Sequence, residues 1–393
     1  MFLKLTIFMT TFLVSNGYEL KQVIVLSRHN IRAPFRYDVS TDLLSPKPWP
    51  TWNMEPGALT SKGRLLEHHM GKYFSDWMIK EKLLDNNCPG DEVFVYANTR
   101  SRTKETAKAF AEGAFGDCVR IFFKNITDHD PIFRFKVRND SAEFKTAVLN
   151  EAKKNLNSTD LRNAFLELNR IVDFGNSSYC KTEKVCDLSE AKTEIVFETN
   201  MDIPRISGGV NIGWSLVDSF LMAYYDGMPT KNVAWGQIQT KTQWESIMAI
   251  LRAYLETRFE AKILDRDIVL PLLEYLSDIF QNGKRKFYLL VAQDANISVL
   301  TTSLNFKHYV LHDQLERTPI GGKVVFQKWY DKEKDQDLLR VDYVYQSTEQ
   351  IRDGVEVGLQ NPPQWQLLEM EKCAVDENGF CPWNDFISIL NSV

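Results

Sequence analysis

The side chains best suited to chemistry lie in three short polar segments, residues 28–32, 98–103 and 293–296. From these segments we select six candidate residues: the arginines Arg28, Arg32 and Arg102, the imidazole of His29, the amide of Gln293 and the carboxylate of Asp294. Several guanidiniums can hold the oxygens of one phosphate through charge-assisted, often bidentate hydrogen bonds. The same cations stabilise the charge that spreads over those oxygens during phosphoryl transfer. This combination predicts a site for a phosphomonoester.

The imidazole and the carboxylate complete a reaction scheme. His29 can attack phosphorus and form a phosphohistidine, which water then hydrolyses. Neighbouring guanidiniums disfavour a protonated imidazole, so His29 stays nucleophilic in mild acid. Asp294 can protonate the leaving alkoxide and later help to activate water. The scheme requires no metal and no other cofactor.

An apolar run precedes each polar segment, at residues 20–27, 93–97 and 286–292, and each run predicts a buried strand. Ligands of open α/β sheets bind beyond the carboxyl ends of the strands, so we expect the segments to converge on one crevice. Taken singly, each signal has a structural alternative: a solvated surface for the arginines, and a helix cap for the aspartate.

The same residues resemble a known family. RHNIRAP, at residues 28–34, is similar to the RHGxRxP signature of histidine acid phosphatases, and Asn30 in third place resembles the bacterial glucose-1-phosphatase branch. Further similar stretches, in order along nearly the whole chain, are KPWPTWN, GALTSKG, YANTRSRTKETAKAF, SLVDSFLMAYYDG, VAWG, HDQLERTPIGGKVVFQKW and ENGFCP. The resemblance implies that His29 is the nucleophile and Asp294 the proton donor. It implies that Arg28, Arg32 and Arg102 bind phosphate.

One departure from the family concerns its second motif, His-Asp, which appears here as Gln293-Asp294. A glutamine amide can donate a hydrogen bond to phosphate but brings no positive charge. We therefore expect Gln293 to bind phosphate more weakly than histidine would, and to lower activity. A His-Asp pair does occur at His312-Asp313, outside the three segments, and we interpret it as structural.

A second departure concerns substrate choice. The family position of a carboxylate that helps to hold the sugar corresponds to Ile203, with Asp202 beside it. The expected substrates are small phosphomonoesters, namely sugar phosphates such as glucose 1-phosphate, or inositol phosphates. The alternative function is that of a weakened or inactive relative that binds a phosphorylated ligand. A cytoplasmic enzyme resembling phosphoglycerate mutase is a third reading, disfavoured by the export signals described below.

The order of elements predicts an α/β fold with a mostly parallel central sheet and helices on both faces. Two stretches near the C-terminus, GKVVFQKWY and LLRVDYVYQ, predict antiparallel strands near an edge. The middle of the chain is dominated by helical patterns, at residues 142–172 and about 241–282. We also expect a helix that begins at Thr60, and another at VLTTSLNF, after the polar stretch QDANIS. We expect residues 18–125 and 265–393 to form the α/β domain, and residues 126–264 to form a smaller inserted helical domain.

The first 17 residues have the pattern of a signal peptide: Lys4, an apolar stretch, then the small residues Ser15 and Gly17. The apolar stretch is too short to span a bilayer, which needs about 20 residues, and no later stretch is long enough. We expect a periplasmic or secreted protein without a membrane segment. The net charge is −5 and the basic residues are dispersed, which disfavours a nucleic-acid partner. Oligomeric state is not predicted.

An even number of cysteines, six, fits export and predicts disulfides. Six cysteines allow 15 connectivities. Local pairing favours Cys180 with Cys186 and Cys373 with Cys381, which leaves Cys88 for Cys118. A zinc site is the less favoured alternative, because the sequence contains no Cys-x-x-Cys.

Overall fold

The computed structural model describes residues 17–126 and 130–392. A central sheet runs through the molecule in the order β10-β8-β7-β1-β6-β2-β3, and β9 also pairs with β8. Its strands are β1 (Tyr18–Arg28), β2 (Val93–Ala97), β3 (Ile121–Phe122), β6 (Phe287–Ala292), β7 (Lys323–Asp331), β8 (Gln336–Tyr345), β9 (Gln364–Leu367) and β10 (Cys381–Pro382). The signal peptide expected at residues 1–17 lies, except for Gly17, outside the described residues and stays a prediction.

Strand directions confirm the expected fold class. β1, β6, β2 and β3 pair in parallel, whereas β7 runs antiparallel to β1 and β8 runs antiparallel to β7. β8 therefore points the same way as β1, and five of the eight strands share one direction. The two C-terminal stretches predicted as antiparallel strands are β7 and β8. They lie between the centre of the sheet and its short edge strands, β9 and β10.

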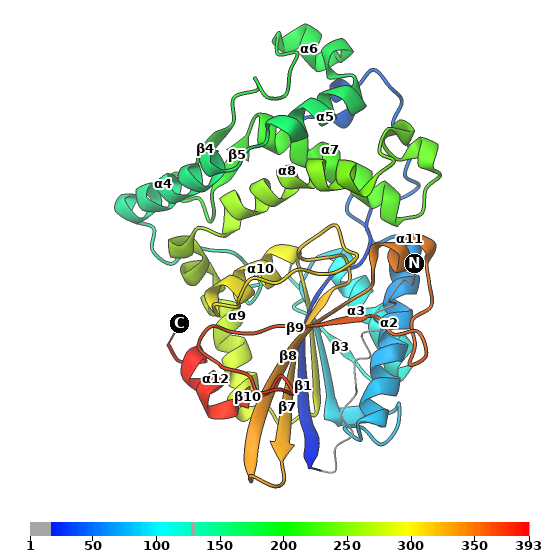
Figure 1. Ribbon diagram of the computed structural model, residues 1–393, viewed down its shortest axis with the longest axis vertical. Coiled ribbons are helices and arrows are strands. Elements are labelled where there is room, and N and C mark those ends of the chain that lie inside the picture. The colour runs from blue at the N-terminus through cyan, green and yellow to red at the C-terminus, as the bar shows by residue number, and fades with distance from the viewer. Residues whose placement is uncertain (1–16, 127–129, 393) are drawn as a thin grey trace, which may run out of the picture.

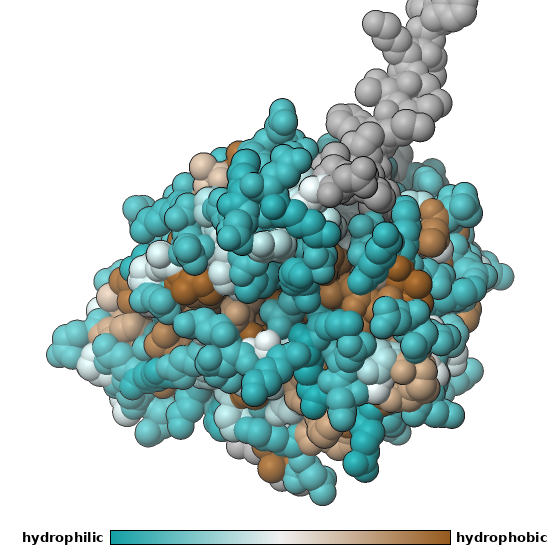
Figure 2. Space-filling model, turned by 90° about the horizontal axis from the view of Figure 1, so that it is seen from below, coloured by the Kyte–Doolittle hydropathy of each residue, from teal (hydrophilic) through white to brown (hydrophobic). Residues whose placement is uncertain are grey.

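Helices cover both faces of this sheet (Figure 1). One face packs against α2 (Ser61–Lys80) and α3 (Ser101–Phe115), and the other against α9 (Lys262–Asn282), α10 (Asp294–Ser303) and α12 (Trp383–Leu390). The surface seen from below Figure 1 is largely hydrophilic, and its hydrophobic residues form separate patches (Figure 2).

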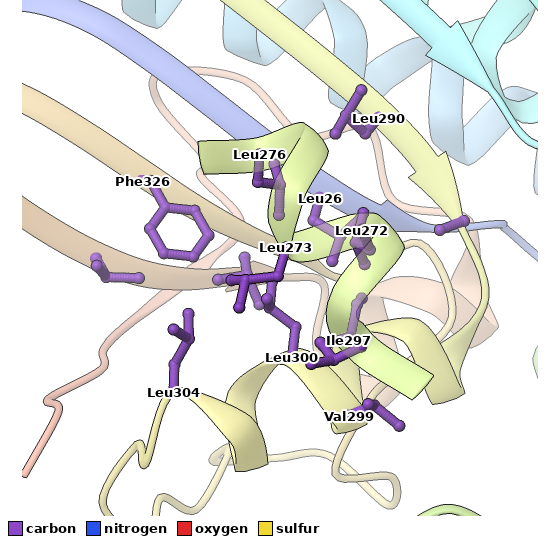
Figure 3. Packing of buried hydrophobic residues seen from close by; sticks show 14 of the residues in the cluster. Leu26, Leu272, Leu273, Leu276, Leu290, Ile297, Val299, Leu300, Leu304 and Phe326 are labelled. Atoms are coloured by element: carbon purple, nitrogen blue, oxygen red, sulfur yellow. The ribbon is translucent and has the colours of Figure 1, made fainter. Parts of the chain in front are cut away.

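Side chains along β1 alternate between two cores, as the two-residue period of a strand requires. Val23 and Val25 join the core under α2 and α3, whereas Ile24 and Leu26 join the core under α9 and α10. In the second core, leucines and isoleucines of α9 and α10 surround Leu26 (Figure 3). Both faces of the strand are apolar, which is why its sequence reads as an unbroken hydrophobic run.

Two glycines let α2 and α3 pack closely. A Cβ on Gly71 would lie 2.1 Å from the carbonyl oxygen of Phe110, and one on Gly113 would lie 2.0 Å from that of His68. Thr60 begins α2 as predicted, because its hydroxyl accepts a hydrogen bond from the backbone N–H of Gly63 at 2.9 Å.

A second group of helices lies beyond the carboxyl ends of the parallel strands (Figure 1). It comprises α4 (Ala142–Ser158), α5 (Arg162–Val172), α6 (Ser178–Glu183), α7 (Gly209–Tyr225) and α8 (Lys241–Phe259), with a hairpin of β4 (Glu194–Val196) and β5 (Arg205–Ser207). Much of this group shares a separate hydrophobic core. The short helices α1 (Thr41–Leu44) and α11 (Thr348–Asp353) complete the set. The domain boundaries at residues 126 and 264 stay a prediction.

Three disulfides pair all six cysteines as predicted from local spacing. The Cα–Cα distances are 5.2 Å for Cys88–Cys118, 4.5 Å for Cys180–Cys186 and 5.7 Å for Cys373–Cys381. Each distance lies within the usual range for a bridge. No helix in the described part of the chain combines the length and apolarity needed to cross a membrane.

Candidate active site

The three strands that precede the polar segments end at the same level. Arg28 of β1 pairs with Ala292 of β6, and Ala97 of β2 pairs with Val291 of β6. The residues that follow therefore emerge side by side at one edge of the sheet. All six candidates line one cavity of about 430 Å³: Arg28, His29, Arg32, Arg102, Gln293 and Asp294.

His29 is buried and held in one tautomer. Its Nδ1 lies 2.8 Å from the backbone oxygen of Asn30. A carbonyl oxygen can only accept, so Nδ1 carries the proton and Nε2 keeps its lone pair. Burial, followed by the charges of Arg102, Arg28 and Arg32, holds the pKa of His29 well below its ordinary value. The imidazole is therefore a neutral base and nucleophile in mild acid.

Asn30 anchors the backbone next to the imidazole. Its Nδ2 donates to Glu67 of α2 at 2.9 Å, and its backbone N–H donates to Thr106 of α3 at 3.1 Å. Glu67 in turn pairs with Lys323 of β7 at 2.7 Å, and both side chains are fully buried. The position of His29 thus depends on one sheet strand and two helices besides its own strand.

Arg28 is the most enclosed of the three arginines. Its Nη1 donates to Glu316 at 2.6 Å and to the backbone oxygen of Thr318 at 2.5 Å, and its Nη2 lies 3.2 Å from Asp294. Burial alone would lower the pKa of Arg28, but Glu316 and Asp294 outweigh it and raise that pKa. Arg28 therefore stays charged and links the base of the cavity to Asp294.

Arg32 reaches across to the helical group. It donates from both terminal nitrogens to Asp218 of α7, at 3.0 and 2.8 Å, and Tyr37 donates to the same carboxylate at 2.5 Å. Its guanidinium lies 3.6 Å from the ring centroid of Phe35. This pairing joins the end of β1 to a helix beyond the sheet.

Arg102 lies in the first turn of α3. Its Nη2 donates to Oε1 of Gln293 at 2.7 Å, and its guanidinium lies 5.1 Å from the ring centroid of Phe35. Burial and then the charge of Arg32 lower the pKa of Arg102 to about 9. A guanidinium with so low a pKa is short of negative charge, and an anion in the cavity would supply it.

Three donors in this site lack an acceptor. Within residues 17–126 and 130–392, the buried Nε atoms of Arg28, Arg32 and Arg102 have no hydrogen-bond partner. Leaving a buried donor of a charged group unpaired is costly. The three guanidiniums also line one cavity, and this concentration of positive charge indicates a site for an anion.

One local prediction was wrong. We expected a helix only from residue 299, after the QDANIS stretch, but α10 begins at Asp294. The reason is a cap: the backbone N–H of Gln293 donates to Oδ1 of Asn296 at 3.1 Å, which starts the helix directly at the end of β6. Asp294 also accepts from the backbone N–H of Ala295 at 2.8 Å. A carboxylate in the first turn of a helix is favoured by the helix dipole.

Sequence reasoning missed the partners of the arginines, Glu316 and Asp218. A buried arginine requires a carboxylate, but nothing in the sequence shows which of the 52 acidic residues it is. The aromatic lining of the cavity was also missed. It includes Trp214 and Tyr254, whose rings stack with centroids 4.4 Å apart.

The His312-Asp313 pair lies outside the cavity, whereas Asp202 is part of its lining. The backbone oxygen of His312 accepts from the hydroxyl of Tyr345 at 3.0 Å, and neither residue of the pair lines the cavity. Asp202 and Ile203 do line the cavity, and Asp202 pairs with Arg134 at 2.7 Å.

Comparison with known proteins places the chain in a family. A model of the histidine phosphatase superfamily (branch 2) matches residues 19–195. A glucose-1-phosphatase from Providencia rettgeri is 39% identical over 383 residues, 94% of this chain and 91% of that protein. Another glucose-1-phosphatase, from Salmonella typhimurium, is 37% identical over 96% of this chain and 93% of that protein. The solved phytase of Citrobacter braakii matches with a TM-score of 0.88 at 25% identity, over 96% of this chain and 98% of that one. The chain therefore belongs to branch 2 of the histidine phosphatase superfamily, as its motifs predicted.

Proposed function

We propose that this protein is an acid phosphatase that hydrolyses small phosphomonoesters through a phosphohistidine on His29. The observation that carries the proposal is that three guanidiniums, those of Arg28, Arg32 and Arg102, line one cavity together with the imidazole of His29. A phosphoryl group brings the negative charge and the acceptor oxygens that suit these guanidiniums. The unprotonated Nε2 of His29 supplies the nucleophile in the same cavity.

The reaction has two displacements. In the first, Nε2 of His29 forms a bond to phosphorus while the bond to the ester oxygen breaks, and Asp294 gives its proton to that oxygen. In the second, water attacks phosphorus, the bond to nitrogen breaks, and Asp294 takes up the proton of the water. Inorganic phosphate leaves and the site returns to its starting state. Throughout, the three guanidiniums hold the equatorial oxygens and stabilise their charge.

The substrate class follows from the size and walls of the cavity. About 430 Å³ lies within the range of sites for small molecules. Beyond the arginines, the aromatic rings of Trp214 and Tyr254 line the wall where a leaving group would lie. The relatives named for glucose 1-phosphate and for phytate support sugar phosphates, such as glucose 1-phosphate, and inositol phosphates as substrates.

The proposed location is the periplasm or the exterior of the cell. Three disulfides support it, because such bridges persist in oxidising compartments. The expected signal peptide at residues 1–17 agrees with it. The proposed partner is the small phosphorylated substrate alone.

Hydrolysis of an aryl phosphate between pH 3 and 7 tests the function. We expect activity to persist well below pH 6.5, the ordinary pKa of histidine, because the folded protein keeps His29 neutral there. Glucose 1-phosphate and inositol hexakisphosphate, assayed in parallel, identify the preferred class. A wild-type protein that binds inorganic phosphate but hydrolyses none of these esters would instead be the binding protein considered above.

A further inference from the structure

The three arginines of the cavity differ in what holds them. Arg28 and Arg32 each form an ion pair with a buried carboxylate. Arg102 has no ion-pair partner among the described residues, and its polar contact is the 2.7 Å bond to Oε1 of Gln293. Arg102 therefore donates to a neutral amide, whereas Arg28 and Arg32 donate to carboxylates.

This bond fixes which way the amide of Gln293 faces. A guanidinium only donates, so the oxygen must be the atom turned toward Arg102, and the Nε2 amino group is directed elsewhere. Gln293 lines the cavity beside Arg102. The amide can thus accept from the arginine while its two N–H groups remain available to an anion.

Positive charge is concentrated around Arg102, so a hydrogen-bond acceptor beside its guanidinium is stabilising. Burial and the like charges of Arg32, Arg100 and Arg28 disfavour the charged guanidinium of Arg102, and the carboxylate of Asp294 offsets only part of this effect. The backbone N–H of Gln293 donates to Asn296 in the first turn of α10, so the amide side chain starts from a fixed backbone position at the end of β6. A fixed acceptor restricts the guanidinium to one orientation, which lowers the entropy lost when phosphate binds.

We propose, on the basis of the phosphatase function above, that Gln293 is a positioning residue that holds the Arg102 guanidinium in place for the phosphate. A protonated imidazole at this position could not do so, because both of its nitrogens donate. The sequence prediction compared glutamine with histidine by charge and as hydrogen-bond donors, and it did not consider the amide oxygen as an acceptor. Gln293 acts on phosphate through Arg102 as well as by its own N–H groups.

A double-mutant cycle in phosphate binding tests this coupling. Inorganic phosphate is titrated by calorimetry into the wild type, Gln293→Met, Arg102→Met and the double variant. Methionine keeps the length of glutamine and removes its acceptor and donors. We expect Gln293→Met to weaken phosphate binding about tenfold or more when Arg102 is present, as for a hydrogen bond to a charged group. In the Arg102→Met background the loss should be several-fold smaller. Equal losses in the two backgrounds would overturn the proposal.

Controls separate this inference from the function on which it rests. Gln281→Met, at the exposed end of α9, should leave phosphate affinity unchanged. Gln293→Asn, too short to reach Arg102, replaces Gln293→Met if the methionine variant does not fold. If Gln293 and Arg102 are coupled in phosphate binding but the protein hydrolyses no ester, the phosphatase function is refuted and the positioning role of Gln293 stands. A wild type that does not bind phosphate would refute both.

Discussion

Arg28, Arg32 and Arg102 could be found in the sequence, but their partners could not. Arg28 precedes His29 directly, Arg32 follows it by three residues, and the third arginine follows a strand, so local pattern alone identifies them. Their carboxylates come from far along the chain, 288 residues from Arg28 and 186 residues from Arg32. Contacts of that separation depend on how the elements pack, which a local pattern does not contain. The Gln293–Arg102 bond, 191 residues apart, was unpredictable for the same reason.

Asp294→Asn should affect poor leaving groups most. An alkoxide such as that of glucose needs a proton to leave, whereas a nitrophenolate leaves without one. We expect the single-turnover rate of phosphoryl transfer from glucose 1-phosphate to fall by about 10²–10⁴-fold. The rate with p-nitrophenyl phosphate should fall much less in the same experiment. Equal losses for both esters would show that Asp294 is not the proton donor.

At the scale of elements, strands were predicted better than helix ends. The apolar runs at residues 20–27, 93–97 and 286–292 became β1, β2 and β6, because strands buried on both faces carry a continuous hydrophobic signal. The start of α10 at Asp294 was missed because the side chain that caps it is that of Asn296, a residue type common in loops. The helical stretches at 142–172 and 241–282 are each two helices, with extended backbone at Thr159 and Ala261.

Gly71→Ala should destabilise the protein through the contact of α2 with α3. The added methyl group would lie 2.1 Å from the oxygen of Phe110, so the two helices must separate. We expect the free energy of unfolding to fall by about 1–3 kcal/mol, as for overpacked cores. Gly358→Ala is the matched control, since its added methyl group would have no atom within 4 Å. Denaturation in urea measures both variants. Equal stability of the two would mean that the close approach of α2 and α3 adapts without cost.

At the scale of the whole molecule, the sequence predicted the parts but not which residues of the helical group line the cavity. An α/β fold, a helical stretch in the middle and three local disulfides were all predictable from spacing and composition. That α7 and α8 supply Asp218, Trp214 and Tyr254 to a cavity at the end of the sheet was not. Residues of both groups of elements therefore line the cavity, and the ion pair between Arg32 and Asp218 joins the two groups directly.

The central claim, that His29 carries the phosphoryl group, is tested most directly by trapping the intermediate. The enzyme is mixed with a phosphomonoester for milliseconds, quenched in alkali and mapped by mass spectrometry, because phosphohistidine is stable in base and labile in acid. The account predicts a phosphoryl group on the peptide that contains His29, which acid removes and which is absent from His29→Ala together with all hydrolysis. A phosphoryl group on another residue, or hydrolysis that persists in His29→Ala, would contradict the account.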